Sequence, residues 1–549
     1  MFTWILILIL FSIAVILGLP ELKRAIQNAR PRRRWAGALK PDQLSVNCYE
    51  DIRDLSRIRD LLSPQRPLQD ALDQILRSMN DNRPDSLLID ERLSISATYL
   101  AQLVSRGEQL IQGNVIEFIT QHFGICAPVP WVAHTQCLKS DQPRWIVERF
   151  VEQLQVALSH RAPILRVGIG RAQYSDQEEI ALLLIQPIFC HLNPFSRQLT
   201  GDLGIIVEGE LYEDVPLELW ITPPSGRPIR GDLVQDGSRF KFNMVGRERG
   251  MYQIELLGEG ARGPVVCLNA PIYRSIPVPQ ELAITEPRGV SRWRWMNVMH
   301  MAQMIHDSRM SAGVSAVKKD KNLTLAAQRY ARIMAQEGYV AHVTSLGEQL
   351  HHRAGDLEMS TDFIYENLSV GADVYEVHQR LMSSPAHRSA ILDPDVTHFG
   401  VGIFKARSLI YGVQLFTCQP VPLSLSRDRQ ELYRLIQGFR KNHGFSRLPT
   451  SRLLESCALS VAESIASGRC LPTEIQQHAQ HLLTQHKERF HIECYSTQVS
   501  RVRRFYCDER LISEQLKSFG AGIAQSASSA PLWIVVIFRV NQRMIQGTD

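Results

Sequence analysis

A pattern of small and apolar residues recurs along this chain, and a repeat constrains the fold strongly because each copy should form the same structural unit. In the central segment the pattern is an apolar face of an expected helix, made of Leu323, Ala326, Ala327 and Ala331. The residues found 131 positions later, without a gap in the alignment, form a similar face: Leu454, Cys457, Ala458 and Ala462. Arg309 and Gly313 recur at the same shift as Arg440 and Gly444.

A strand-like motif supports the repeat. Residues 399–403 (FGVGI) recur 120 positions later as residues 519–523 (FGAGI). Because the helix recurs 131 positions later, the segment between helix and strand is 11 residues shorter in the last copy. An N-terminal copy matches more weakly at a shift of 230, through Leu93, Ala97 and Ala101, and we align residues 167–169 (VGI) with residues 401–403. The repeat predicts three related domains over residues 48–192, 293–420 and 427–545.

The segment between the first two copies has a different pattern. Short alternating runs over residues 203–273 are separated by turn clusters, which predicts a small antiparallel, immunoglobulin-like β-sandwich over residues 200–276. Residues 258–263 (GEGARG) match the GxGxxG pattern of dinucleotide-binding loops. That loop must open a helix, whereas a strand-like run follows here, so a hairpin loop is favoured.

The chain is 549 residues long, which indicates several domains. Its 61 basic and 56 acidic residues give a net charge of only +5, so nucleic acid is not an expected partner. No two of its ten cysteines form a CxxC motif, which argues against zinc ribbons. Four cysteines near the C-terminus are the first candidates for disulfides, with the pairing left open: Cys457, Cys470, Cys494 and Cys507.

The N-terminus carries an uncharged apolar run over residues 2–19, just long enough to cross a membrane as a helix. We expect residues 1–35 to be a membrane anchor followed by a basic segment. A cleavable signal peptide is disfavoured because no basic residue precedes the run and no A-x-A site follows it. The basic residues after the run would keep the body of the chain cytoplasmic under the positive-inside rule, or could bind anionic headgroups, so topology stays open.

The central copy contains five motifs in a fixed order. They are residues 341–347 (AHVTSLG), 365–368 (YENL), 383–388 (SSPAHR), 398–402 (HFGVG) and 411–416 (YGVQLF). Together they resemble the bacterial branch of the CAP superfamily of cysteine-rich secretory, antigen five and pathogenesis-related proteins, over about residues 295–418. One departure is Leu381, where family members usually have Trp. The C-terminal copy lacks the first three of these motifs, and the N-terminal copy retains only residues 159–161 (SHR) before its strand.

The resemblance implies a CAP-type α-β-α sandwich for the central copy, and thus an α+β chain with two degenerate CAP-like domains beside it. It also implies a cleft in which histidines and an acid converge, which holds a divalent metal in several family members. We assign His342, Glu366 and His387 to this cleft, as a ligand set that would suit zinc.

The residues themselves leave a structural alternative open for the same motifs. Ser384 followed by Pro385 predicts the start of a short helix, whose N-terminus would keep His387 neutral. The turn could equally be architectural, with Arg388 binding a carboxylate or a helix end. The supporting residues are Ser384, Arg388, Asn367, Thr344, Ser345 and His398.

The expected function is a membrane-attached, extracytoplasmic CAP protein that acts as a non-enzymatic binding or envelope-associated module for a divalent metal or a small apolar ligand. A hydrolase is one alternative, although neither a GxSxG nor an HExxH motif occurs. A purely structural role in adhesion or assembly is the other.

Overall fold

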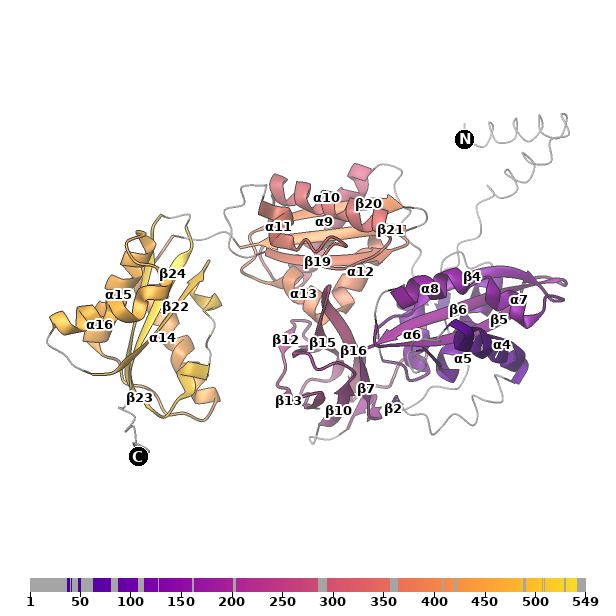
Figure 1. Ribbon diagram of the computed structural model, residues 1–549, viewed down its shortest axis with the longest axis horizontal. Helices are drawn as coiled ribbons and strands as arrows, with labels where there is room; N and C mark the ends of the chain where they lie inside the picture. Colours follow the sequence, from indigo (N-terminus) through magenta and orange to yellow (C-terminus); the bar gives the residue numbers. More distant parts are fainter. Residues whose placement is uncertain are drawn as a thin grey trace. The chain divides into compact units, whose positions relative to one another are not determined.

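The computed structural model has a mixed α/β fold, in agreement with the expected class (Figure 1). It describes residues 37–39, 41, 48–50, 63–79, 87–106, 113–126, 128–159, 162–200, 204–284, 294–355, 364–406, 409–418, 422–486, 490–505, 507, 509–527 and 530–540. Two compact units divide the chain: residues 1–297 with 369–389 and 405–410, and residues 298–368 with 390–404 and 411–549. Each unit is described by itself.

The first unit begins with a module in which helices cover both faces of one sheet. Its helices are α4 (Arg66–Met79), α5 (Glu91–Ser105), α6 (Gly113–His122), α7 (Pro143–Glu148) and α8 (Val151–Ser159). Its strands are β3 (Leu87–Ile89), β4 (Trp131–Leu138), β5 (Ile164–Gln173) and β6 (Glu178–Ile188), in the order β3-β5-β6-β4. Successive residues of a strand point to opposite faces. Accordingly, Leu183 and Ile185 pack with α4, α7 and α8, while Leu182 and Leu184 pack with α5 and α6.

The same unit contains a β-sandwich. One sheet has the order β13-β14-β10-β7, from β7 (Cys190–Leu192), β10 (Ile205–Leu211), β13 (Val234–Asp236) and β14 (Arg239–Met244). The other has the order β12-β11-β15-β16-β9, from β9 (Gln198–Leu199), β11 (Leu217–Thr222), β12 (Ile229–Arg230), β15 (Gly250–Gly260) and β16 (Gly263–Arg274). Residues 258–263 form the hairpin between β15 and β16, in which Gly260 pairs with Gly263.

Short strand pairs complete this part of the chain. Strand β2 (Cys48–Tyr49) pairs with β8 (Phe195–Ser196), and β1 (Gly37–Leu39) pairs with β17 (Leu282–Ile284).

The central segment has a four-stranded sheet in the order β18-β20-β21-β19. Its strands are β18 (Lys318–Lys319), β19 (Ile364–Gly371), β20 (His398–Ala406) and β21 (Leu409–Thr417). Its helices are α9 (Arg294–Ser311), α10 (Lys321–Glu337), α11 (Leu350–Gly355), α12 (Val374–Ser383) and α13 (Pro385–Leu392).

The C-terminal segment is a shorter version of the same arrangement. Its helices are α14 (Leu425–Asn442), α15 (Arg452–Ala466) and α16 (Ile475–Gln485), and its sheet has the order β22-β24-β23. The strands are β22 (Ile492–Val499), β23 (Leu516–Gln525) and β24 (Leu532–Val540). Separate apolar cores lie on the two faces of this sheet, one with α14 and one with α15 and α16.

The three segments share one helix-to-strand contact, in which a strand glycine lies against the backbone of a helix. A Cβ on Gly402 would lie 2.0 Å from the Ala327 carbonyl oxygen, and a Cβ on Gly522 would lie 2.3 Å from the Ala458 carbonyl carbon. In the N-terminal segment the equivalent glycine is Gly170, where a Cβ would lie 2.3 Å from the Thr98 nitrogen. These three glycines therefore occupy one position of the repeat.

This contact corrects our alignment of the N-terminal strand. We matched residues 167–169 with residues 401–403, which pairs Gly168 with Gly402. In the structure Gly168 lies against Leu93, as Gly400 lies against Leu323, so the alignment was wrong by two residues. The spacing of glycines that face the helix is the structural signal, whereas the letters V-G-I agree by coincidence.

The helix caps give independent support for the repeat. Asp90, Asp320 and Ser451 each cap the helix of their segment with a side-chain oxygen. Each also donates its backbone N–H to the carbonyl of the residue before the first strand glycine, at 2.8–2.9 Å. The caps are separated by the same shifts of 230 and 131 found in the sequence.

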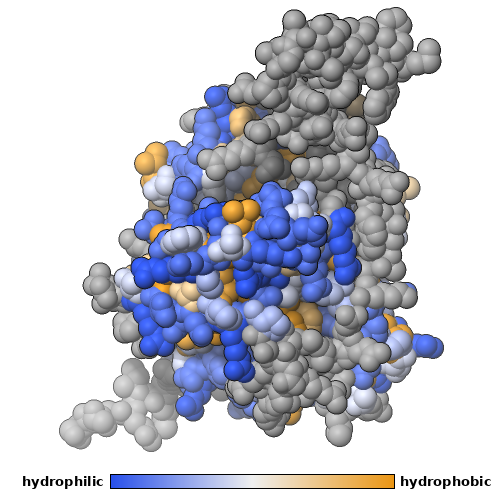
Figure 2. Space-filling view, turned by 90° about the vertical axis from the view of Figure 1, so that its right-hand side faces the viewer, coloured by the Kyte–Doolittle hydropathy of each residue, from blue (hydrophilic) through white to orange (hydrophobic). Residues whose placement is uncertain are grey.

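No helix in the described part of the chain is long and apolar enough to cross a membrane. The apolar run at residues 2–19 lies outside the described residues, as do the basic residues that follow it. Figure 2 shows a face on which the described residues are mainly hydrophilic, with hydrophobic residues scattered among them. Within the described part of the chain no disulfide is formed, including among the four C-terminal cysteines that we singled out.

Candidate functional site

The loop after α10 presents His342, and its own polar residues hold it in place. Gly338 ends α10 with a positive φ of 71°, which turns the chain out of the helix. The Thr344 hydroxyl accepts a hydrogen bond from the Glu348 nitrogen at 3.0 Å, and the Ser345 hydroxyl donates to Glu337 at 2.9 Å. Thr344 and Ser345 thus make loop-securing contacts.

A cluster of three side chains lies beside this loop: His342, Arg353 and Glu366, which we call the His342 cluster. Nδ1 of His342 lies 3.0 Å from Oε1 of Glu366 on β19. The Arg353 guanidinium donates to both oxygens of Glu366, from Nη2 to Oε1 at 3.0 Å and from Nη1 to Oε2 at 3.1 Å. The side chains of Glu366 and Arg353 are only 4% and 9% exposed, whereas that of His342 is 29% exposed. His342 is therefore the member that a ligand can reach.

Arg353 is fixed from several sides. Its guanidinium carbon lies 3.3 Å from the centre of the Tyr330 ring, and its Nη2 also donates to the His342 carbonyl at 2.9 Å. The Tyr330 hydroxyl in turn donates to the Ala341 carbonyl. A planar guanidinium suits this combination of stacking and paired hydrogen bonds to a carboxylate. The result is a rigid, charge-balanced support for His342.

The hydrogen bond to Glu366 determines which ring nitrogen of His342 faces the carboxylate and which one faces away from it. When Nδ1 carries the hydrogen and donates it to Glu366, Nε2 keeps its lone pair. Nε2 has no hydrogen-bond partner among the residues that the structure describes. A carboxylate that orients a histidine in this way is also the usual support of a histidine metal ligand.

Glu366 suits the orienting role better than that of a direct metal ligand. Both of its oxygens accept hydrogen bonds from Arg353, and a divalent cation on them would lie beside a positive charge. Within the described ranges, no group of three or more His, Cys, Asp or Glu side chains is placed to hold a metal ion. His387 belongs to the first compact unit, and His342 and Glu366 belong to the second, so the convergence of the three stays a prediction.

The S-P-A-H-R turn caps a helix and binds a buried acid. Helix α13 begins at Pro385, and the Ser384 hydroxyl accepts from the His387 nitrogen at 3.4 Å. The same hydroxyl donates to Oε2 of Glu255 on β15 at 2.9 Å, and the Ala386 nitrogen donates to that oxygen at 2.9 Å. Glu255 is 1% exposed, and burial raises its pKa to about 7.

Arg388 extends the contact of this turn with the sandwich. Its Nε donates to the Gly226 carbonyl at 2.8 Å, and its Nη1 lies 3.4 Å from the Met382 carbonyl at the end of α12. Arg388 therefore binds a loop carbonyl and a helix end, which are architectural contacts of the kind we considered as the alternative.

Of the two remaining supporting residues, Asn367 is buried and His398 is half-buried. The Asn367 amide donates to Gln414 at 3.4 Å, and both residues are buried. Nδ1 of His398 lies 3.0 Å from the Thr397 hydroxyl, and burial lowers the pKa of His398.

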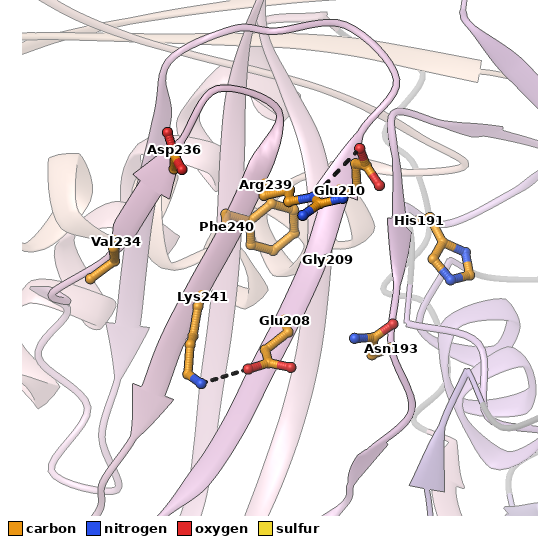
Figure 3. Close-up of a pocket in the computed structure, with 10 residues that line it drawn as sticks. All are labelled: His191, Asn193, Glu208, Gly209, Glu210, Val234, Asp236, Arg239, Phe240 and Lys241. Carbon is orange, nitrogen blue, oxygen red and sulfur yellow. Dashed lines mark ion pairs between the residues drawn. The ribbon is translucent and has the colours of Figure 1, made fainter.

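A separate pocket of about 420 Å³ lies on the β13-β14-β10-β7 sheet of the sandwich (Figure 3). Four of its charged side chains form two pairs across the strands: Lys241 with Glu208 at 2.6 Å, and Arg239 with Glu210 at 4.0 Å. Exposed pairs of this kind neutralise each other, and Asp236 is the charged lining residue outside the two pairs.

Sequence reasoning missed two residues that organise these sites, Arg353 and Glu255. Arg353 lies 11 positions after His342, in a helix that carries none of the recognised motifs. Glu255 interrupts an apolar run between Ile254 and Leu256, and a charge within such a run was the available signal.

The helix-covered sheet and the ordered motifs define the class of this central segment as a CAP-type domain. Residues 299–419 match the family model of the cysteine-rich secretory protein family, so this part of the chain is a CAP domain. A search of curated protein sequences gives no match.

Several solved structures resemble parts of the chain. An outer surface protein of Borrelia burgdorferi is 20% identical, with 22% of this chain and 92% of that chain covered, at a TM-score of 0.21. An extracellular SCP-domain protein of Bacillus anthracis is 12% identical, with 41% and 84% covered, at a TM-score of 0.22. A cysteine-rich secretory protein of Staphylococcus aureus is also 12% identical, with 42% and 87% covered, at a TM-score of 0.20. At these scores the likenesses add no argument to the family match.

Proposed function

We propose that this chain is a membrane-tethered, extracytoplasmic CAP-domain protein that binds a small ligand at the His342 cluster without turning it over. The apolar run at residues 2–19 would be the tether. Support for the location comes from the match of residues 299–419 to the cysteine-rich secretory protein family.

The observation that carries the proposal is the pairing of Glu366 with both Arg353 and His342. Glu366 is charge-balanced and nearly inaccessible, and it holds an accessible imidazole in one orientation. A hydrolase of the serine or cysteine type needs a nucleophile hydrogen-bonded to its base. In the described part of the chain no hydroxyl or thiol is hydrogen-bonded to His342. A site with an oriented imidazole and no nucleophile favours binding over catalysis.

Mass spectrometry of the protein as purified from its native membrane tests this function. We expect a small molecule that co-purifies with the full chain and is lost in His342→Ala. His486→Ala, which removes an exposed histidine at the end of α16, should keep the ligand. Equal ligand content in all three proteins would place the ligand away from the His342 cluster, and the absence of any co-purifying molecule would favour the purely structural alternative. Turnover of generic peptide or ester substrates that His342→Ala abolishes would favour the hydrolase.

The expected zinc site has its own test. If His342, Glu366 and His387 bind zinc, calorimetric titration should show binding that His342→Ala removes and that weakens in acid, because protons compete for the imidazole nitrogens. Equal zinc affinity in wild type and His342→Ala would contradict a zinc site at His342. Glu366 and Arg353 would then orient His342 in a site that binds no metal.

A further inference from the structure

Two cysteines face each other across the core of the β-sandwich. Cys190 lies on β7 in the four-stranded sheet, and Cys267 lies on β16 in the five-stranded sheet. The two residues are 3% and 2% exposed and belong to the same apolar core. The Cys190 thiol donates to the Cys267 carbonyl oxygen, which lies 3.6 Å from its sulfur. The two thiols are therefore neighbours.

A β-bulge directs Cys267 toward the opposite sheet. In the β15–β16 pair, Leu256 is opposite Leu268 and Leu257 is opposite Val266, so Cys267 is the extra residue. The bulge interrupts the alternation of the strand, and the adjacent residues Cys267 and Leu268 are both buried. Without it, neighbouring side chains would point to opposite faces of the sheet.

We propose that Cys190 and Cys267 form a disulfide that joins the two sheets wherever the chain folds in an oxidising compartment. This rests on the extracytoplasmic location proposed above. The two thiols lose two protons and two electrons to a small disulfide such as oxidised glutathione, which is reduced to two thiols through a mixed-disulfide intermediate. The new S–S bond closes a loop between residues 77 positions apart.

The environment of the pair sets when this reaction occurs. The hydrogen bond with Cys267 and burial raise the pKa of Cys190 well above its ordinary range, so the folded protein holds little of the reactive thiolate. Exchange then takes place while the chain folds, before the sheets close over the sulfurs. A disulfide present afterwards is protected from reductants by the same burial.

Cys126 is a third thiol nearby, and it differs from the pair. Its sulfur lies 3.7 Å from Oε1 of Glu50, to which it donates, and burial raises its pKa well above the ordinary value. Because Cys126 is held by a carboxylate, it serves as the matched control.

The first experiment refolds the denatured full chain in detergent with reduced and oxidised glutathione, then alkylates the free thiols and maps peptides by mass spectrometry. We expect a Cys190–Cys267 cross-link in wild type and in Cys126→Ala. Free Cys190 and Cys267, or a cross-link to Cys126, would overturn the proposal. Wild type refolded this way should also melt about 5 °C or more higher than the same protein fully reduced, a comparison that needs no variant.

The second experiment separates this proposal from the proposed location. Quenching intact cells with acid and then alkylating the denatured protein, in which buried thiols are accessible, should leave Cys190 and Cys267 unlabelled if the chain folds outside the cytoplasm. A pair that links during refolding but is fully labelled in cells would support the disulfide and overturn the location. A pair that fails to link during refolding would overturn the disulfide whatever its state in cells.

Discussion

At Glu366 a nearly inaccessible carboxylate is stable because Arg353 supplies two hydrogen bonds and a compensating charge. The same carboxylate fixes the ring of His342. Removing one partner of such a buried pair leaves the other charge uncompensated, and this destabilises a protein more than the intact pair stabilises it. The cluster is thus both a structural support and the basis of the proposed site.

Arg353→Ala should lower the free energy of unfolding of the CAP domain by about 3 to 5 kcal/mol, since it leaves Glu366 buried and unpaired. Arg353→Ala combined with Glu366→Gln should recover part of this loss. Arg144→Ala, which breaks an exposed pair with Glu148 on α7, should change stability by less than about 0.5 kcal/mol. Denaturant unfolding compares the variants, and equal losses for Arg353→Ala and Arg144→Ala would contradict the burial argument.

The raised pKa of the buried Glu255 carboxyl group should make the free energy of unfolding depend on pH. Burial raises its pKa most, the Ala386 N–H and the Ser384 hydroxyl lower it, and the nearby Glu117 charge raises it slightly, so that the pKa moves from 4.5 to about 7. The native state therefore keeps this proton at pH values where the unfolded chain has lost it. The resulting stability is full below about pH 4.5 and is lost as the pH rises through about 7.

Wild type should accordingly lose up to about 3 kcal/mol relative to Glu255→Gln between pH 5 and pH 8. Melting curves at the two pH values measure the difference. Glu259→Gln changes an exposed residue on the same strand and should keep the wild-type dependence. If Glu255→Gln and wild type respond equally to pH, Glu255 is not the titrating group.

At this scale the sequence predicted which residues stand near the site but not what they touch. The H-V-T-S and E-N-L motifs pointed to His342 and Glu366, and in the structure Nδ1 of His342 lies 3.0 Å from Oε1 of Glu366. The contact of Glu255 could not be predicted, because Ser384 lies 129 positions away, and Arg353 was missed because its helix carries none of the recognised motifs. Local periodicity carries no information about such contacts.

At the scale of elements, the close approach of a strand to a helix defines each copy of the repeat. Gly402 and its equivalents occur where the helix backbone leaves no room for a Cβ. The helix periodicity and the strand motif could be recognised in the sequence because they depend on local spacing. The two-residue error in the N-terminal alignment arose because the position of a strand against a helix depends on packing.

Gly402→Ala should destabilise the CAP domain by roughly 3 kcal/mol or more, because the new Cβ would overlap the Ala327 backbone, which cannot move as a side chain can. Gly522→Ala should act alike in the C-terminal segment. Gly438→Ala is the control: it lies in α14 with nothing within 4 Å of its Cβ position, and should stabilise by about 0.5 to 1 kcal/mol. Thermal unfolding distinguishes them, and tolerance of Ala at Gly402 and Gly522 would contradict the shared contact.

At the scale of the whole molecule, the segment outside the repeats should determine where the protein resides. Removing residues 1–35 should convert the chain from membrane-bound to soluble with its fold retained, because the apolar run and the basic cluster precede every repeat. Fractionation followed by circular dichroism checks both parts. Full-length, uncleaved protein in the soluble fraction would show that residues 2–19 do not anchor the chain.

The side of the membrane on which the CAP domain lies bears on its ligand and on the redox state of its cysteines. Protease protection in intact cells that express the full chain measures it directly. If the protein is extracytoplasmic, added protease digests residues 36–549 while the cells are intact. If these residues are protected until the cells are lysed, the body of the chain lies in the cytoplasm, as the positive-inside rule alone would suggest, and the proposed location is wrong.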